Sequence, residues 1–335
     1  MRVFSSLLVS VILEVSFIRA LLFREPLDLG DKRSSPVINR NFPDPGVLKV
    51  GDKWYAFGTN DGEIKVQVAT SKDFKHWTLK KDDALPKVAP WEAEVDHWAP
   101  DVIERDDGKF VLYYSGEAKK SKLRQHCVGV AVSEDPGGPY VPEEEPWACP
   151  LERGGAIDAS GFRDVDGKRY VAYKVDGNTI GPGGDCNNGV KPKVSTPIML
   201  QEVEEDGIKK IGNPVQILDR DESDGPLVEA PYITRTEEGV YFLFYSSHCF
   251  NSKKYDVRYA TSLALEGPYR KAKERLLKTG DFHLTSPGGA TVSPDGMNIT
   301  FHADCPDDRC MHIAKLKIDG DVATVELHDG YFKLW

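Results

Sequence analysis

The sequence predicts an all-β fold, a five-bladed β-propeller, because one strand pattern recurs five times and no helical periodicity of any length is present. Each copy is an apolar stretch, a tight turn that ends in glycine, and an aromatic-rich stretch. The copies begin at residues 44, 101, 158, 229 and 288, so they are spaced by 57, 57, 71 and 59 residues. This regularity is typical of four-stranded blades around an axis rather than of a sandwich.

The first half of each copy reads as strand, tight turn, strand. The turn glycines are Gly51, Gly108, Gly167, Gly239 and Gly296, and each stands between two β-rich runs. Glycine supplies the positive φ that a short hairpin needs, so we expect a hairpin at each of these positions.

The second half of the copy has its own pattern. Ala69-Thr70-Ser71, Ala131-Val132-Ser133 and Ala260-Thr261-Ser262 each end a later strand, and the last two lead to Gly138-Pro139-Tyr140 and Gly267-Pro268-Tyr269. The repeated unit therefore has four strands, as a propeller blade does.

The ends and the charge of the chain limit its environment. Residues 1–20 read as a secretory signal, with Arg2, an apolar stretch to Leu13 and Ala20 at a possible cleavage site. That stretch is shorter than the ~20 residues of a membrane span. We therefore expect a signal peptide at 1–20, an N-terminal lead-in at 21–36 and the propeller at 37–335, secreted as a monomer that does not bind a membrane. A net charge of -10 with no basic block argues against nucleic acid as a partner.

The cysteines agree with secretion. Six are present, with no C-x-x-C pair, which fits an oxidising compartment better than a zinc or redox site. The triplet Asn298-Ile299-Thr300 is a glycosylation sequon, so Asn298 is a predicted acceptor, although it falls in a predicted strand.

Propeller topology brings three acids together. The first strand of each blade lines the central channel, and Asp44, Asp158 and Glu229 stand at or just before the start of such strands. They should meet at one mouth of the channel. The loops 176–195 and 248–254 return to the same mouth, so we expect them to form the rim of a pocket.

The rim loops also suggest disulfides. Cys186 and Cys249 would lie on rim loops of adjacent blades, which leaves Cys127 to pair with Cys149 and Cys305 with Cys310. Six cysteines allow 15 pairings, so other connectivities stay open.

The three acids have different neighbours. Asp44 stands between two prolines that restrict its direction, Glu229 has an apolar setting that should keep a proton on it near neutrality, and Asp158 is flanked by small and apolar residues. Cleavage of a glycosidic bond needs one acid and a second carboxylate, which this set offers. The alternative is that each acid caps a turn or pairs with an arginine, but equivalent positions in different blades argue against it.

With these residues in place, the chain resembles glycoside hydrolase family 43, the arabinanase, arabinofuranosidase and β-xylosidase group with a five-bladed propeller. The matching segments span residues 41 to 302 and occur in a specific order. They are Asn41-Phe42-Pro43-Asp44-Pro45, Trp54-Tyr55-Ala56-Phe57-Gly58-Thr59, Ser71-Lys72-Asp73-Phe74-Lys75-His76-Trp77, Trp98-Ala99-Pro100-Asp101-Val102, Ile157-Asp158 with Phe162-Arg163-Asp164, Thr196-Pro197-Ile198, Glu229-Ala230-Pro231 and Gly267-Pro268-Tyr269.

The resemblance implies an inverting O-glycosyl hydrolase. Asp44 would be the general base that activates water, Glu229 the general acid, and Asp158 the residue that orients the acid and modulates its pKa. The expected substrate is an arabinose- or xylose-containing plant cell-wall polysaccharide or oligosaccharide. Sugar identity and endo or exo action stay open, with the long loop 176–195 leaning toward exo action. The alternative is a non-catalytic carbohydrate-binding propeller, either a lectin or a degenerate hydrolase.

Other site residues are less closely tied to chemistry. Phe42 and Trp98 lie beside first-strand starts, where they would either stack on a sugar ring or pack between blades. Asp101, at the start of the second copy, is assigned to substrate binding. Arg258 resembles a family position that binds substrate, with a salt bridge as the alternative.

The resemblance implies no cofactor for the chemistry. Many members carry a histidine in the last blade that helps to hold a central ion or water, but Gly289 of Ser286-Pro287-Gly288-Gly289-Ala290 stands in that place. A central structural calcium is therefore left open. His302 is a possible replacement for that histidine, and an ordinary core role is the alternative.

Overall fold

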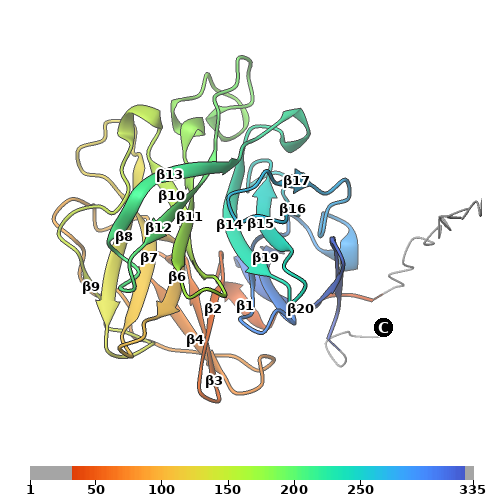
Figure 1. Ribbon diagram of the computed structural model, residues 1–335, viewed down its shortest axis with the longest axis horizontal. Helices are drawn as coiled ribbons and strands as arrows, with labels where there is room; N and C mark the ends of the chain where they lie inside the picture. Colours follow the sequence, from red (N-terminus) through yellow and green to blue (C-terminus); the bar gives the residue numbers. More distant parts are fainter. Residues whose placement is uncertain (1–31, 329–335) are drawn as a thin grey trace, which may run out of the picture. The chain divides into compact units, whose positions relative to one another are not determined.

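Five antiparallel sheets form the blades of a β-propeller in the computed structural model, which describes residues 32–328 (Figure 1). The predicted fold class is confirmed. The predicted signal segment, residues 1–20, lies outside the described residues.

Helices are short in this part of the chain. The described residues contain five 3₁₀ turns: η1 (Leu151–Arg153), η2 (Gly177–Ile180), η3 (Asp185–Asn187), η4 (Glu222–Asp224) and η5 (Asp281–His283). None of the helices within residues 32–328 has the length and apolarity needed to cross a membrane.

The first four blades each contain four strands that lie side by side in sequence order, as the repeat predicts. They are β2 (Gly46–Val50), β3 (Lys53–Gly58), β4 (Gln67–Ser71) and β5 (Thr78–Leu79); β6 (Trp98–Glu104), β7 (Phe110–Glu117), β8 (His126–Ser133) and β9 (Val141–Pro142); β10 (Ala156–Arg163), β11 (Arg169–Val175), β12 (Ile198–Val203) and β13 (Lys210–Leu218); and β14 (Val228–Arg235), β15 (Tyr241–Ser247), β16 (Asp256–Ser262) and β17 (Arg270–Lys271).

The fifth blade joins the two ends of the described chain. It contains β18 (Gly288–Val292), β19 (Asn298–Cys305), β20 (Asp308–Asp319), β21 (Val322–Glu326) and the early strand β1 (Ile38–Asn41). One end of β20 pairs with β1, where Ile38 lies opposite Met311, and the other end pairs with β21. The ring is therefore closed by main-chain hydrogen bonds within the fifth blade, between the early strand β1 and the late strand β20.

The apolar core lies between adjacent blades. Buried side chains of blades one and two form one cluster, and similar clusters lie between blades two and three and between blades three and four. The cluster between blades five and one contains Phe42, Trp54 and Met311. Because each blade buries both of its faces against neighbours, the first strands are held at fixed positions around the channel.

Phe42 belongs to this core rather than to a sugar site. Its side chain is fully buried, and its ring packs so closely on Gly58 that a Cβ there would lie 3.0 Å from a ring carbon. The predicted sugar contact is wrong, and packing between blades, the alternative, is what the structure has.

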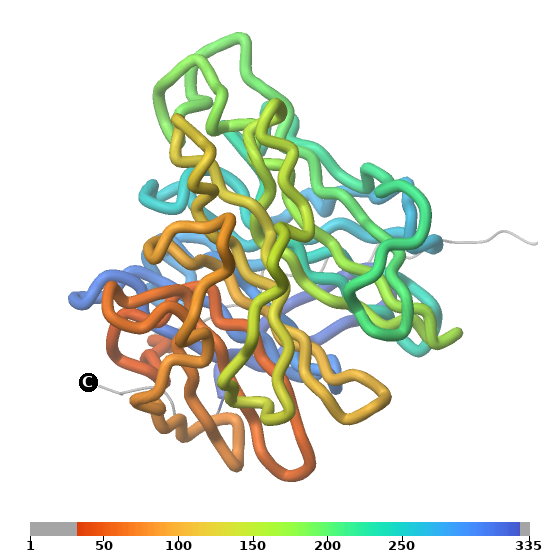
Figure 2. The backbone as a smooth tube through the Cα atoms, turned by 90° about the vertical axis from the view of Figure 1, so that its left-hand side faces the viewer, coloured from red at the N-terminus to blue at the C-terminus, as the bar shows by residue number. Residues whose placement is uncertain are grey.

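The loops expected to form a rim lie at one end of the blades. The segment between β11 and β12 extends beyond the strand ends in both views (Figure 1, Figure 2). This segment and the loop between β15 and β16 both supply residues to one pocket, which is described below.

Truncation of Phe42 tests its assignment to the core. Phe42→Ala is expected to lower the free energy of unfolding by about 3–5 kcal/mol, because a fully buried aromatic ring is replaced by a cavity. Urea unfolding followed by tryptophan fluorescence measures this loss. Unchanged stability combined with a raised KM would instead return Phe42 to the sugar site.

Candidate active site

All three predicted acids line one pocket of about 550 Å³. All five blades contribute to it: Asp44 and Thr59, Trp98 and His126, Asp158 and Asp176, Glu229 and Tyr255, and Arg309. The predicted convergence of the acids on one mouth therefore agrees with the geometry. Catalytic roles for them are proposals, which are argued in the next subsection.

A backbone bend at each first strand places these side chains. Asp44, Ala99, Asp158, Ala230 and Gly289 have φ between 44° and 58°, in the left-handed region. In blades two to five the register of the first and second strands shifts at this point. Asp44 and Asp158 therefore occupy the same position of their blades. Glu229 comes one residue before the bend residue of its blade, Ala230. The sequence predicted equivalent positions for all three acids, but only Asp44 and Asp158 are equivalent.

Asp44 is built to remain ionised. Thr59 Oγ1 donates to its Oδ2 over 2.7 Å, and Arg309 Nη1 lies 3.8 Å from the same oxygen. Burial pushes the pKa of Asp44 upward, but the charge of Arg309 and the Thr59 hydrogen bond contribute to a net pKa well below its usual range. The ionised carboxylate at the pocket wall has free oxygen lone pairs that can accept a proton or a hydrogen bond.

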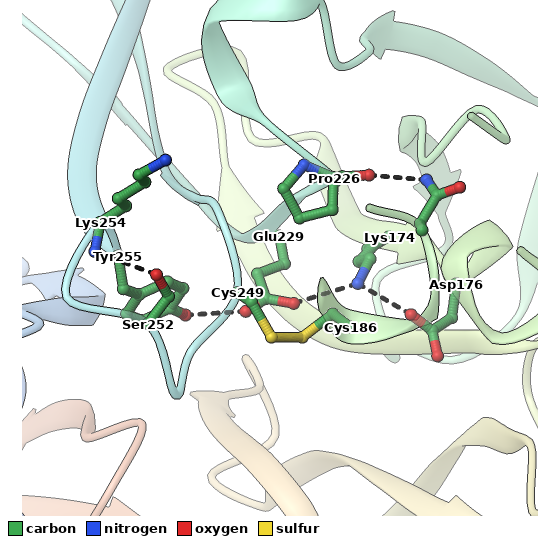
Figure 3. The surroundings of a disulfide bond; sticks show 10 residues. Lys174, Asp176, Cys186, Pro226, Glu229, Cys249, Ser252, Lys254 and Tyr255 are labelled. Carbon is green, nitrogen blue, oxygen red and sulfur yellow. Dashed lines mark hydrogen bonds and ion pairs between the residues drawn. A yellow bond between two sulfur atoms is a disulfide. The ribbon is translucent and has the colours of Figure 1, made fainter. Parts of the chain in front are cut away.

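Glu229 has two polar partners in place of the expected apolar setting (Figure 3). Lys174 Nζ donates to its Oε2 over 3.0 Å, and the Tyr255 hydroxyl donates to its Oε1 over 2.8 Å. Lys174 is completely buried and also pairs with Asp176 over 2.8 Å. Burial lowers the pKa of Lys174, but Asp176 and Glu229 outweigh that effect and keep it charged.

Asp158 is held by the backbone of the next blade. Its Oδ2 accepts a hydrogen bond from the Ala230 backbone N–H over 2.9 Å. Burial first, and then the negative charge of Glu229, raise the pKa of Asp158 far above its usual value. Lys174 forms its ion pairs with Glu229 and Asp176 and not with Asp158, so Asp158 favours its protonated form where Asp44 favours the carboxylate.

The rim loops are tied together by a disulfide. Cys186, on the loop between β11 and β12, is bonded to Cys249 on the loop between β15 and β16, beside Glu229 (Figure 3). The structure also joins Cys127 to Cys149 and Cys305 to Cys310, so all three expected pairs are present. A covalent link between these two loops limits how far the pocket wall can open.

Trp98 lines the pocket, and its ring stacks on the His126 ring with centroids 3.6 Å apart. This position is compatible with the predicted sugar contact, which stays a prediction. Asn298 is the first residue of β19 and is half-buried, and its glycosylation stays a prediction too.

Asp101 and Arg258 do not line this pocket. Asp101 is buried between blades and accepts from the Gly161 N–H over 2.8 Å, while Arg258 pairs with Asp224 and Asp256. Their assignment to substrate binding is wrong. In blade two, the register shift between Trp98 and Asp101 changes the side of the strand on which Asp101 lies.

Several pocket residues had no individual prediction, and three of them contact the acids directly: Lys174, Tyr255 and Arg309. Only one carried a signal, since Lys174 is a charged residue within the apolar run Tyr170-Val171-Ala172-Tyr173-Lys174-Val175. A charged side chain inside such a strand needs a buried partner, and Glu229 and Asp176 are those partners.

His302 stands against Asp44 rather than in a metal cage. It is fully buried, and its Nδ1 accepts from the Asp44 backbone N–H over 3.1 Å. A side chain at Gly289 would enter this contact, because a Cβ there would lie 2.7 Å from Asp44 Oδ1. One imidazole nitrogen is far from the six to eight oxygens that calcium takes, so these residues do not fit a calcium ion.

A second group with metal-binding atoms lies at the rim. Asp96, Glu117 and His126 come close enough to share an ion. The Arg124 guanidinium already pairs with both carboxylates, however, and His126 Nε2 bonds the Asp96 carbonyl oxygen. The protein's own cation therefore already occupies the carboxylates of this group.

Comparison with known proteins gives a consistent result. The family model described as "Glycosyl hydrolases family 43" matches residues 33–318. An extracellular endo-alpha-(1->5)-L-arabinanase of Bacillus subtilis is 28% identical over 78% of this chain and 77% of its own length. An extracellular exo-alpha-(1->5)-L-arabinofuranosidase of Cellvibrio japonicus is 25% identical over 80% and 78%.

Two further comparisons extend this result. A beta-xylosidase of Bacillus subtilis is 26% identical over 71% of this chain and 42% of its own length. A solved structure, a thermostable family-43 glycoside hydrolase, superposes with a TM-score of 0.74 at 26% identity, covering 88% of this chain and 96% of the other.

Asp101 should influence stability in a pH-dependent way. Burial raises its pKa from 3.8 to about 7, so the proton-linked stabilisation is complete below the lower value and is lost as the pH rises through the higher one. Asp101→Asn keeps an oxygen for the Gly161 N–H but cannot ionise. Its stability advantage over the wild type should therefore grow by on the order of a few kcal/mol from about pH 4 to pH 8.

Urea unfolding of both proteins at about pH 4, 6 and 8 measures this difference. An advantage that does not change with pH would contradict the assignment of the raised pKa to Asp101.

Proposed function

Because this chain belongs to glycosyl hydrolases family 43 and is an O-glycosyl hydrolase, we propose that it hydrolyses arabinose- or xylose-containing plant cell-wall glycans with inversion. One observation carries this proposal. Carboxyl groups from three different blades share one pocket, and their surroundings keep Asp44 charged while a proton is retained near Glu229. An acid and a base of this kind are what hydrolysis of a glycosidic bond requires.

Asp44 is the proposed general base. Arg309 and Thr59 hold its carboxylate in the ionised form, and the left-handed backbone bend directs it to the pocket. In the proposed step, Asp44 takes a proton from a water molecule while that water attacks the anomeric carbon. Inversion needs the base and the acid to stand about 6.5–9.5 Å apart, so that the water fits between base and sugar.

Glu229 is the proposed general acid and Asp158 its partner. Glu229 gives its proton to the leaving glycosidic oxygen, so the bond to the anomeric carbon breaks as the water adds on the opposite face. Asp158, fixed by the Ala230 N–H, places a second carboxyl beside Glu229 and keeps a proton in this part of the pocket. No step uses a metal or an organic cofactor.

The substrate class rests on the relatives. Their names cover endo- and exo-acting enzymes on alpha-(1->5)-L-arabinan, and beta-xylosidase. The pocket of about 550 Å³, with its rim closed by the disulfide Cys186–Cys249, favours release of short products from a chain end. Incubation with aryl arabinofuranoside, aryl xyloside and linear arabinan, followed by product identification, separates these possibilities.

Secretion and action as a monomer complete the proposal. Three disulfides are stable in oxidising compartments, the relatives are named extracellular, and residues 1–20 read as a signal. N-terminal sequencing of protein from the culture medium of a secreting host, with size-exclusion chromatography, tests both points.

A non-catalytic carbohydrate-binding propeller is less well supported. Such a protein has no use for two half-buried carboxyl groups around a fully buried lysine in its binding pocket, because each costs desolvation free energy.

Removal of the acid or the base separates catalysis from binding. Glu229→Gln and Asp44→Asn keep the shape of each side chain but remove its proton chemistry, so each should lower kcat by roughly 10²–10⁴-fold. Titration calorimetry should show that oligosaccharide binding is largely retained. Asp101→Asn is the matched control, since this acid lies outside the pocket and should leave kcat and KM unchanged. Full activity of either pocket variant would contradict the assigned roles.

The stereochemical outcome tests inversion directly. Proton NMR of the first product should show the anomeric configuration opposite to that of the substrate, because water attacks from the face opposite the leaving group. Retention would require a covalent intermediate and would overturn the role of Asp44 as a base.

A further inference from the structure

A ring of hydrogen bonds connects the five left-handed bends around the channel. In four of the five blades, the N–H of the bend residue donates to a side chain on or just after the second strand of the preceding blade. The four bonds are Ala99 to Thr59 Oγ1 (2.8 Å), Asp158 to Ser115 Oγ (3.1 Å), Gly289 to Ser246 Oγ (3.0 Å) and Asp44 to His302 Nδ1 (3.1 Å).

The acceptors occupy one equivalent position. Ser115, Ser246 and His302 lie on the second strands of their blades, opposite Trp98, Glu229 and Gly288, each of which directly precedes a bend residue. Thr59 follows β3, and its N–H donates to the carbonyl of Pro43, the residue that directly precedes the bend residue Asp44. Thr59 therefore holds the corresponding position in blade one. The position therefore carries a hydrogen-bond acceptor for the next blade.

Lys174 is the exception. It lies on β11 opposite Ile157, at the same position of blade three, and should serve the Ala230 N–H of blade four. A charged lysine has three donors and no acceptor, so it cannot do so. The Ala230 N–H binds Asp158 Oδ2 instead.

The lysine turns to the acids. Its Nζ contacts Glu229 Oε2 at 3.0 Å and Asp176 Oδ1 at 2.8 Å, and its side chain has no exposed surface (Figure 3). A fully buried ion pair contributes little to stability, because desolvation offsets the Coulomb attraction. Two other blades carry a serine at this position, and a serine in place of Lys174 would complete the ring at a lower desolvation cost. A requirement other than stability is therefore met by the lysine.

We propose that Lys174 is a positioning residue of the reaction: it anchors the Glu229 carboxyl group and, by leaving the Ala230 N–H unclaimed, lets that N–H fix Asp158 beside it. This inference rests on the proposed role of Glu229 as the acid. At the contact between blades three and four, Lys174 thus replaces the usual acceptor of the ring, and both Glu229 and Asp158 are held there.

The charge of Lys174 also affects when the acid loses its proton. The groups that face Glu229 are Lys174 from β11, Tyr255 before β16 and Asp158 from β10, with Asp176 behind the lysine. Lys174 is the positive charge in direct contact with Glu229. Its charge lowers the pKa of the neighbouring Asp158, so without it this pair of acids should keep a proton to higher pH.

Two substitutions separate the two effects. Lys174→Ser supplies the hydroxyl of the other blades, which can reclaim the Ala230 N–H and release Asp158. Lys174→Met removes the charge, but has no strong acceptor and leaves that N–H on Asp158. With an oligosaccharide substrate, kcat should fall by roughly 10²-fold in the serine variant and by less in the methionine variant, while KM changes by less than about threefold.

In both variants the basic limb of the kcat/KM profile should move to higher pH. Aryl glycosides with a nitrophenyl leaving group should be affected much less, because that leaving group needs little protonation. Lys271→Met is the matched control: Lys271 pairs with Asp221 and Asp224 away from the pocket, so stability should fall while the pH profile stays in place.

The outcomes are distinguishable. Wild-type protein without activity on any arabinoside or xyloside would overturn the proposed function. Active wild type, together with Lys174 variants that keep its kcat, pH profile and leaving-group dependence, would overturn this inference alone. If the serine variant does not fold in a thermal melt, the methionine variant decides, because its side chain is close to lysine in size.

Discussion

The structure depends on the left-handed backbone bend at the start of each first strand. Residues other than glycine adopt this conformation at a cost of about 1 kcal/mol or more, and four of the five bend residues here are Asp or Ala. Hydrogen bonds from the bend N–H groups to the neighbouring blade offset this cost. The same bend turns the side chains of Asp44 and Asp158 into the channel mouth, so blade assembly and site assembly share one set of contacts.

The pocket divides charge between its two sides. Asp44 lies with Arg309 and Thr59, which favour the carboxylate, whereas burial and the negative charge of Glu229 disfavour the carboxylate of Asp158. This division depends on burial, because water would screen each of these interactions. The closed ring and the disulfide between the rim loops keep the groups in place.

The sequence motifs and the tertiary contacts explain different parts of the site. Phe42, Asp101 and Trp98 all stand beside first-strand starts, yet only Trp98 reaches the pocket. Strand alternation normally decides which side a residue faces, but a bulge shifts that alternation locally, as it does between Trp98 and Asp101. Bulges leave no clear mark in the sequence, so side-chain direction near them could not be predicted.

The sequence alone was enough to predict the number of blades, the hairpin turns and the three acids, because these are local or repeating features, and the repeat in turn suggested the disulfide pairs. Tertiary structure decided the rest. Lys174, Tyr255 and Arg309 come to the acids from β11, the β15–β16 loop and blade five, and Arg258 is drawn instead to Asp224 and Asp256. The charge of a buried acid depends on partners distant in the chain, and those partners are fixed only when the ring closes.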